Sequence, residues 1–257
     1  MPFPEIDPIL LQIGPVAIRW YALSYVAGIL LGWWYLGKLN RLDPDNPPLN
    51  QKAYDDFVVW AVIGILLGGR LGYVFFYNAG YYLSNPGEIF AVWQGGMSFH
   101  GGLIGAILAV WGMSRWHGLE FWRIIDLCAC ITPIGLGLGR IANFINGELY
   151  GRITDVPWGV VFPGQAFARH PSQLYEAALE GIVLFCIMYY AVYHTKLRHK
   201  PAALSGLFLI GYSIFRSLVE LVREPDAHLG LFGGFFSMGQ LLSIPMLLLG
   251  LFLLFRP

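Results

Sequence analysis

Long, nearly uninterrupted apolar stretches dominate the pattern of hydrophobic and polar positions along this chain. A helix needs about 20 mostly apolar residues to cross the hydrocarbon core of a bilayer. Seven stretches approach this length and composition: residues 20–39, 57–77, 101–116, 121–141, 173–193, 204–222 and 238–255. The pattern therefore predicts an all-α integral membrane protein with about seven transmembrane helices.

The composition supports a membrane protein and excludes several other classes. Of the 257 residues, 56% are hydrophobic and only 12% are charged, against about 25% charged in a typical soluble domain. So little polar surface excludes a disordered chain and a secreted disulfide scaffold. The 16 basic and 16 acidic residues cancel, so no global field favours nucleic-acid binding. We predict a single membrane domain covering residues 1–257.

The distribution of lysine and arginine predicts the orientation of the spans, because cytoplasmic loops carry an excess of basic residues. Nine of the sixteen basic residues fall on one side: Lys38, Arg41, Lys52, Arg115, Arg123, Lys196, Arg198, Lys200 and Arg256. The opposite side holds Arg19, Arg152, Arg169 and Arg223. We therefore expect the N-terminus outside and the C-terminus in the cytoplasm.

The two longest connections, residues 78–99 and 143–172, then both fall on the outer side. They carry turn sequences, and residues 156–162 have the composition of a short strand. These connections predict a small outer (periplasmic) cap over the helices.

Three arginines, Arg70, Arg140 and Arg216, lie inside or at the end of predicted spans. A charge in the hydrocarbon costs about 2.5–3.5 kcal/mol on insertion scales, so such a residue usually faces a partner or an interior cavity. With a rise of about 1.5 Å per residue, we expect all three arginines and His100 at one depth near the outer interface.

Two interpretations of these arginines stay open. They can pair for structure with acidic residues, and the spacing of Arg216 and Glu220 allows an i, i+4 pair on one helix face. They can also form an anion site, since guanidinium groups bind phosphate through two donors and keep their charge. The abundant phosphate at that depth is a phospholipid headgroup. For the first interpretation, the acidic residues that could pair with these arginines are Asp126, Glu148, Glu176, Glu180 and Glu220.

Small and polar residues surround His100 and Arg140. Glycines recur in residues 95–96, 101–105 and 135–139, which suits either close approach of a ligand or ordinary helix packing. Asn143, Asn146 and Glu148 follow Arg140 and offer amide and carboxylate groups for glycerol hydroxyls. The three cysteines lie in apolar runs, and no clustered ligands point to a metal.

The run GRIANFINGELYGR at residues 139–152 resembles the signature of the bacterial prolipoprotein diacylglyceryl transferases. The resemblance extends to SFHGGL at 98–103, RHPSQLYE at 169–176 and the stretch from Tyr212 to Asp226. RWY at 19–21 and GGR at 68–70 also fit. The connection between Gly164 and Arg169 is shorter than in some members of the family, which bears on substrate contacts made by that loop.

The resemblance implies transfer of the sn-1,2-diacylglyceryl group from phosphatidylglycerol to the lipobox cysteine of a prolipoprotein. A thioether forms and glycerol phosphate leaves, as the first step of lipoprotein maturation at the bacterial inner membrane. No cofactor and no metal are implied. The implied catalytic residues are His100, Arg140 and Arg216, with His100 acting as a base or orienting the headgroup. The implied phosphatidylglycerol-binding residues are Tyr21, Arg70, His100, Arg140, Asn143, Glu148, Gly151, Tyr212 and Arg216.

Two other classes remain as alternatives. Arginine and glycine pairs within membrane helices also occur in transporters of anions or lipids, but the two halves of this chain show no repeat. The other alternative is a serine or cysteine hydrolase. Ser172 follows His170, but no nucleophile elbow surrounds it. A lipid-modified peptide product distinguishes the transferase from a transporter.

Overall fold

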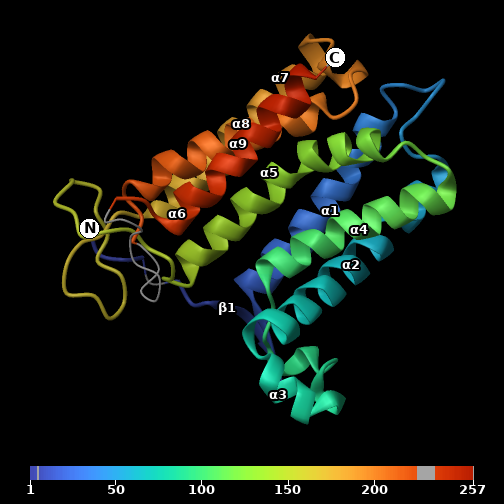
Figure 1. Ribbon diagram of the computed structural model, residues 1–257. Coiled ribbons are helices and arrows are strands. Elements are labelled where there is room, and N and C mark those ends of the chain that lie inside the picture. The colour runs from blue at the N-terminus through green and yellow to red at the C-terminus, as the bar shows by residue number, and fades with distance from the viewer. Residues whose placement is uncertain (5, 225–234, 257) are drawn as a thin grey trace. The chain divides into compact units, whose positions relative to one another are not determined.

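The computed structural model describes residues 1–4, 6–224 and 235–256, and most of these residues are helical (Figure 1). Pro225 and Asp226, at the end of the last motif noted in the sequence, lie outside the described residues. The chain forms two compact units. One unit combines the two end parts of the sequence, Met1–Leu36 and Asp126–Pro257, and we call it the outer-sequence unit; the name refers to the sequence and not to a side of the membrane. The other unit, Gly37–Ile125, is called the central unit.

Each of the seven predicted stretches coincides with a helix. Single helices are α1 (Trp20–Asn40), α2 (Gln51–Tyr77), α4 (Phe99–His117), α5 (Phe121–Ile145), α8 (Ala203–Glu220) and α9 (Met238–Phe255). The remaining stretch combines α6 (Ser172–Glu176), the π-helical segment η3 (Ala177–Val183) and α7 (Leu184–His194). A short 3₁₀ turn, η4 (Leu197–His199), precedes α8.

Five helical segments of the described chain are long and apolar enough to cross a membrane: Gln51–Tyr77, Phe121–Ile145, Ser172–His194, Ala203–Glu220 and Met238–Phe255. The protein is therefore a helical membrane protein, as the hydrophobic pattern predicted. The helices α1 and α4 are present at the expected positions but fall outside this set.

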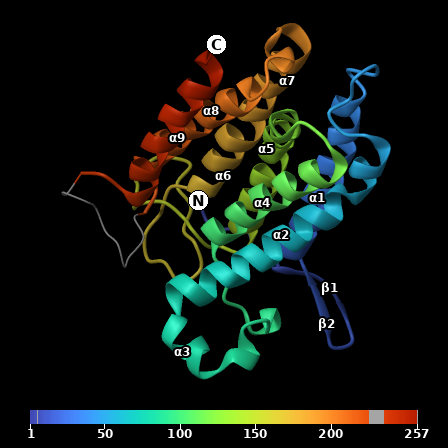
Figure 2. The same ribbon diagram turned by 45° about the vertical axis from the view of Figure 1, so that its right-hand side comes forward.

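Glycines bring the helices of the outer-sequence unit into close contact. The helices α8 and α9 run side by side (Figures 1 and 2), and a Cβ on Gly206 would lie 2.7 Å from the carbonyl oxygen of Gly250. A Cβ on Gly181 of η3 would lie 2.7 Å from the Cα of Gly137 in α5. Small residues permit such backbone contacts between membrane helices. Packing thus accounts for Gly137 within the glycine-rich run 135–139.

Asp126 caps the N-terminus of α8. Its buried carboxylate accepts hydrogen bonds from the backbone N–H groups of Ala202 and Ser205, both at 2.8 Å, and from the Ser205 hydroxyl at 2.6 Å. The first N–H groups of a helix have no partner within the helix, so a carboxylate at this position satisfies them. Asp126 was one of the acids considered as a partner for the membrane arginines, and the structure gives it this different role.

An N-terminal hairpin, which the sequence pattern did not predict, precedes α1. Strands β1 (Ile9–Ile13) and β2 (Val16–Arg19) pair antiparallel across a turn at Gly14, whose φ is 58°. The run has no regular alternation of apolar and polar residues, so its strand character was hidden beside the first apolar stretch.

The short strand predicted at residues 156–162 is wrong. Val160 and Val161 form only isolated bridges, with Arg169 and with Pro2 respectively. Pro157 and Gly159 interrupt the segment, and two neighbouring residues with different partners cannot build a ladder. The connection 143–172 is held by single contacts instead.

In the central unit, α2 and α4 also pack side by side (Figures 1 and 2). A Cβ on Gly72 of α2 would lie 2.8 Å from the Cα of Gly101, and one on Gly68 would lie 2.7 Å from the Cα of Gly105. The glycines after His100 therefore serve helix packing, the plainer of the two interpretations. Along the sequence, α2 and α4 are joined by α3 (Ala79–Ser84) and the turns η1 (Pro86–Glu88) and η2 (Val92–Gln94).

Candidate active site

Arginines and glutamates gather inside the outer-sequence unit around Glu176, at the end of α6. The Glu176 carboxylate is fully buried, with Arg140 Nε at 2.7 Å from Oε2 and Arg216 Nη1 at 2.9 Å from Oε1. The two arginines come from α5 and α8, 76 positions apart in the sequence (216 − 140). The fold therefore brings Arg140 and Arg216 together on one carboxylate.

Glu180, one turn further along the same helical segment, completes this arrangement. It is also fully buried, with Arg140 Nη2 at 3.8 Å and Arg216 Nη1 at 4.0 Å. Glu176 directly precedes the π-helical segment, and Glu180 lies within it. Single π-helical turns are rare and frequently mark functional sites. No sequence signal indicated this local widening of the helix.

Arg216 and Glu220 form the i, i+4 ion pair that their spacing predicted. Glu220 also contacts Arg223, whose Nη1 lies 3.3 Å from Oε1, and Arg223 Nε lies 3.7 Å from Glu176 Oε1. Arg223 was expected only as one of the basic residues of the outer side. Its spacing of three from Glu220 was the signal that could have identified it. We call Arg140, Glu176, Glu180, Arg216, Glu220 and Arg223 the ion cluster.

The ion cluster buries its glutamate side chains more deeply than its arginine side chains. Glu176 and Glu180 are 0% exposed, whereas the side chain of Arg140 is 18% exposed and that of Arg216 is 11% exposed. A buried charge without a partner is strongly destabilising, so each buried carboxylate needs an arginine close to it. This requirement holds the arginine side chains in a fixed orientation. The pairing interpretation is thus confirmed: Arg140 and Arg216 both have buried acidic partners.

The segment after α5 places polar groups a few residues from Arg140. Asn143 Nδ2 donates to Glu148 Oε1 at 2.8 Å, and Asn146 Nδ2 donates to the same oxygen at 3.3 Å. Asn143 is buried and Glu148 is exposed. The structure thus joins the predicted residues Asn143 and Glu148 directly.

Gly151 holds the connection 143–172 against the end of α8. Its N–H donates to the carbonyl of His170 at 2.8 Å, and a Cβ here would lie 2.5 Å from the carbonyl oxygen of Val222. Gly151 therefore acts through its backbone and its lack of a side chain.

His170, beside Gly151, lies in a network with a neighbouring tyrosine. Its Nδ1 lies 3.3 Å from the hydroxyl of Tyr175, which also accepts a hydrogen bond from Trp158 Nε1 at 2.6 Å. Burial lowers the pKa of the His170 imidazole below its usual range, and the charge of Asp155 partly opposes this.

The two predicted tyrosines also belong to the outer-sequence unit. Tyr21 is the second residue of α1, and its hydroxyl lies 3.0 Å from that of Tyr25. Tyr212 lies on α8 one turn before Arg216 and stacks on Phe208 with ring centroids 6.0 Å apart. Tyr212 therefore shares a helix face with Arg216.

Arg70, in the central unit, binds the protein backbone. Its side chain donates to the carbonyls of Glu88 at 2.8 Å, Ile89 at 2.7 Å and Gly96 at 3.2 Å, and also to Gly95. Arg70 is only 1% exposed. These contacts give it a structural role in ordering the connection 78–99.

His100 is the second residue of α4, two positions after the N-cap Ser98, and it is exposed. The Ser98 hydroxyl accepts from the N–H of Gly101 at 3.1 Å, which fixes the first turn of the helix. His100 and Arg70 lie in the central unit, whereas Arg140 and Arg216 lie in the outer-sequence unit. Convergence of all four residues stays a prediction.

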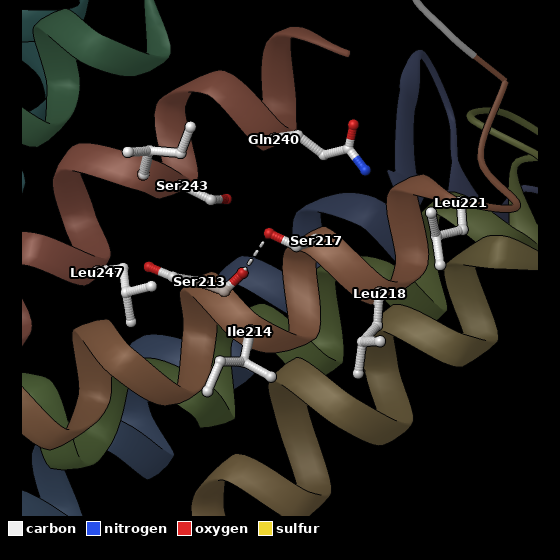
Figure 3. Close-up of a pocket in the computed structure, with 9 residues that line it drawn as sticks. Ser213, Ile214, Ser217, Leu218, Leu221, Gln240, Ser243 and Leu247 are labelled. Atoms are coloured by element: carbon white, nitrogen blue, oxygen red, sulfur yellow. Dashed lines mark hydrogen bonds between the residues drawn. The ribbon is translucent and has the colours of Figure 1, made fainter. Parts of the chain in front are cut away.

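A pocket of about 430 Å³ lies between α8 and α9 (Figure 3). Three of its hydroxyls donate to carbonyls of their own helix: Ser213 to Leu209, Ser217 to Ser213 and Ser243 to Gly239. Because these hydroxyls are satisfied, the pocket presents a mainly apolar lining. The sequence gave no sign of it. Its lining residues are Ser213, Ile214, Ser217, Leu218, Leu221, Gln240, Ser243, Ile244 and Leu247.

The fold and the ion cluster define a helical membrane protein with an arginine-rich polar site among apolar helices. A family model described as prolipoprotein diacylglyceryl transferase matches residues 8–256, so the chain belongs to that family. The resemblance noted in the sequence motifs is thereby confirmed.

Curated relatives whose names agree with this family are similar to nearly the whole chain. The phosphatidylglycerol--prolipoprotein diacylglyceryl transferase of Brucella anthropi is 52% identical over 260 residues, covering 99% of this chain and 92% of the relative. The proteins of the same name from Brucella canis and Brucella ovis are 53% and 52% identical, each with the same 99% and 92% coverage.

Proposed function

We propose that this protein transfers the sn-1,2-diacylglyceryl group of phosphatidylglycerol to the lipobox cysteine of prolipoproteins, the first step of lipoprotein maturation. Membership of the family over residues 8–256 supports the reaction. The structural observation that carries the proposal is the meeting of Arg140 and Arg216 on the buried Glu176 carboxylate. Two oriented arginines whose side chains are partly exposed are suited to a phosphodiester.

In this reaction the cysteine sulfur attacks the glyceryl carbon that carries the phosphate. A carbon–sulfur bond forms, the carbon–oxygen bond to phosphate breaks, and glycerol phosphate leaves with the bonding electrons. Arg140 and Arg216 stabilise the negative charge that develops on the leaving phosphate oxygens. The thiol proton passes to a base, for which His100 is the candidate; its other possible role is to hold the headgroup by a hydrogen bond.

The remaining site residues position the lipid. Asn143 and Glu148, already joined by a hydrogen bond, suit the hydroxyls of the glycerol headgroup. Tyr21 and Tyr212 are proposed to contact the lipid, and Gly151 to hold the connection that carries Glu148. Arg70, proposed from the motif as a lipid-binding residue, is better suited to ordering the connection before His100. The reaction needs no cofactor or metal.

The transferase is tested with purified protein, phosphatidylglycerol vesicles and a lipobox peptide. The expected product is a thioether-linked diacylglyceryl peptide, detected by mass spectrometry together with released glycerol phosphate. A matched peptide with serine in place of the cysteine should give no product. Movement of lipid between leaflets without a modified peptide would contradict the proposal and indicate a transporter.

We also propose seven spans in the bacterial inner membrane, with α1 and α4 added to the five spanning segments. The N-terminus lies outside, the C-terminus lies in the cytoplasm and the site opens to the outer face. The asymmetry of basic residues supports this orientation. The connections 78–99 and 143–172 then form the outer cap.

Cysteine labelling checks this orientation. In a variant with Cys128, Cys130 and Cys186 replaced by alanine, single cysteines at Asn78 and at Gly164 should react with a membrane-impermeant thiol reagent added to spheroplasts. A cysteine at Arg198 should react only after the membrane is permeabilised. The reverse labelling pattern would overturn the topology and the proposed side of the active site.

The pocket between α8 and α9 is proposed to receive an acyl chain of phosphatidylglycerol. It is mainly apolar, and its lining residue Gln240 (Figure 3) directly follows Gly239, where a Cβ would lie 3.1 Å from Arg216 Nε. A phosphate on Arg216 would therefore leave an acyl chain close to this pocket. Burying methylene groups there would contribute binding energy in proportion to the apolar area removed from water.

Filling the pocket tests this placement. Ile244→Trp should raise the KM for long-chain phosphatidylglycerol by about 10-fold, a loss of about 1.4 kcal/mol, and should affect a short-chain lipid less. Leu248→Trp on the same helix serves as control, because Leu248 is 61% exposed and does not line the pocket. Equal effects of the two substitutions would exclude the pocket as an acyl-chain site.

A further inference from the structure

We infer that Gly239, in the first turn of α9, is a positioning residue for Arg216; the catalytic meaning of this role rests on the proposed function. A Cβ at Gly239 would lie 2.5 Å from Glu220 Oε1, 2.7 Å from Glu220 Cδ and 3.1 Å from Arg216 Nε. The lack of a side chain at this position therefore leaves the space that the Glu220–Arg216 ion pair occupies.

Two arginines and burial hold Glu220 in this position. It is only 3% exposed, and its Oε1 is paired with both Arg216 and Arg223. The negative carboxylate also lies against the first turn of α9, where the helix carries partial positive charge. The first turn of α9 thus packs directly against the Glu220 carboxylate.

The backbone at Gly239 is held as well. Ser237 accepts from the N–H of Gln240 at 3.2 Å, and the Gln240 side chain accepts from the N–H of Ser237 at 3.1 Å. This reciprocal capping box fixes the start of the helix. An added methyl group at position 239 would therefore displace the Glu220 carboxylate more readily than it would displace the helix.

Displacing Glu220 changes the orientation of Arg216. The guanidinium group of Arg216 is bound by Glu220 through Nη2 and by Glu176 through Nη1. With one of these two carboxylates moved, the guanidinium group is free to rotate toward the other and away from the phosphate. Alanine forms helices better than glycine, so intrinsic helix propensity gives no reason for glycine here.

The test compares Gly239→Ala with Gly250→Ala in the full-length protein. The control lies on the same helix, where a Cβ would lie 2.8 Å from the Gly206 carbonyl oxygen and 2.9 Å from Ile210 Cγ1, neither of which is charged. Both substitutions crowd the contact between α8 and α9. The readouts are kcat for peptide lipidation, the Kd for phosphatidylglycerol in nanodiscs and the melting temperature.

Gly239→Ala should lower kcat at least about 10-fold and weaken phosphatidylglycerol binding. Gly250→Ala should keep kcat within about 2-fold of the wild type even where its melting temperature falls. Near-normal kcat and Kd in Gly239→Ala, or an equal loss of both in Gly250→Ala, would overturn the inference. A wild-type protein that forms no lipidated peptide would refute the proposed function, while the binding comparison would still decide the role of Gly239.

A second variant separates displacement of Glu220 from a general folding defect. In the Glu220→Asp background the carboxylate is shorter by one methylene and withdraws from position 239. Adding Gly239→Ala there should cost much less kcat and binding than it costs in the wild type, a coupling that a double-mutant cycle measures. This comparison holds even if Gly239→Ala alone is too unstable to purify, because the double variant should then recover folding. The same loss in both backgrounds, or no recovery, contradicts the inference.

Discussion

Arg140→Lys is expected to lower kcat/KM for peptide lipidation by about 100-fold or more, the usual cost of removing one oriented donor to a developing anion. Lysine keeps the positive charge but has a single ammonium group in place of a planar guanidinium. Arg140 uses Nε to bind Glu176 at 2.7 Å while its side chain stays 18% exposed. One lysine nitrogen cannot hold Glu176 and meet the phosphate with the same geometry. Arg216→Lys should behave alike, because Arg216 binds Glu176 as well.

The measurement is initial rate against phosphatidylglycerol concentration for each variant, normalised to the amount of folded protein. Arg115→Lys, at an exposed arginine in the last turn of α4, is the matched control and should keep the wild-type rate. Normal turnover in Arg140→Lys at normal expression would mean that guanidinium geometry is irrelevant, and the phosphate-binding role would be withdrawn.

His100→Gln is expected to lower the lipidation rate by about 10²–10⁴-fold at neutral pH if His100 is the general base. Glutamine keeps a hydrogen-bond donor but cannot accept a proton near neutrality. A cysteine thiol has an ordinary pKa of about 8.5, so an increasing fraction ionises without help as the pH rises. The deficit of a mutant that lacks its base should therefore shrink at high pH.

The pH–rate profiles of His100→Gln and the wild type, with one lipobox peptide, decide between the two roles. A deficit that disappears at high pH supports the base. A small deficit that stays constant across the pH range indicates that His100 holds the headgroup by a hydrogen bond. The exposed position of His100 at the start of α4 leaves its ring accessible for either role.

The helices were largely predictable from the sequence because the length of an apolar stretch is a local property. All seven predicted stretches are helical, and α9 has the same bounds as its prediction, residues 238–255. The Arg216–Glu220 pair was predictable for the same reason, since i, i+4 neighbours on a helix meet whatever surrounds them. The family also followed from local order, because residues 139–152 form one continuous motif.

Other features depended on contacts between distant segments, and the sequence could not determine them. Asp126 and Glu176 were equal candidates as arginine partners, yet one caps α8 and the other binds Arg140 and Arg216. The same holds for the hairpin before α1, which forms, and for the strand predicted at residues 156–162, which does not. Each outcome depends on whether successive backbone N–H and C=O groups meet a partner segment in register.

The sequence by itself determined that this is a helical membrane protein of the prolipoprotein diacylglyceryl transferase family, with arginines inside its apolar helices. Only the tertiary structure decided that Arg140 and Arg216 share Glu176, that Arg223 joins them through Glu220, and that Arg70 binds a loop backbone. The physical reason is the range of the interactions. Hydrophobic periodicity and helix spacing act within a few residues, whereas a buried charge takes whichever partner the packing of distant helices brings within a few ångströms.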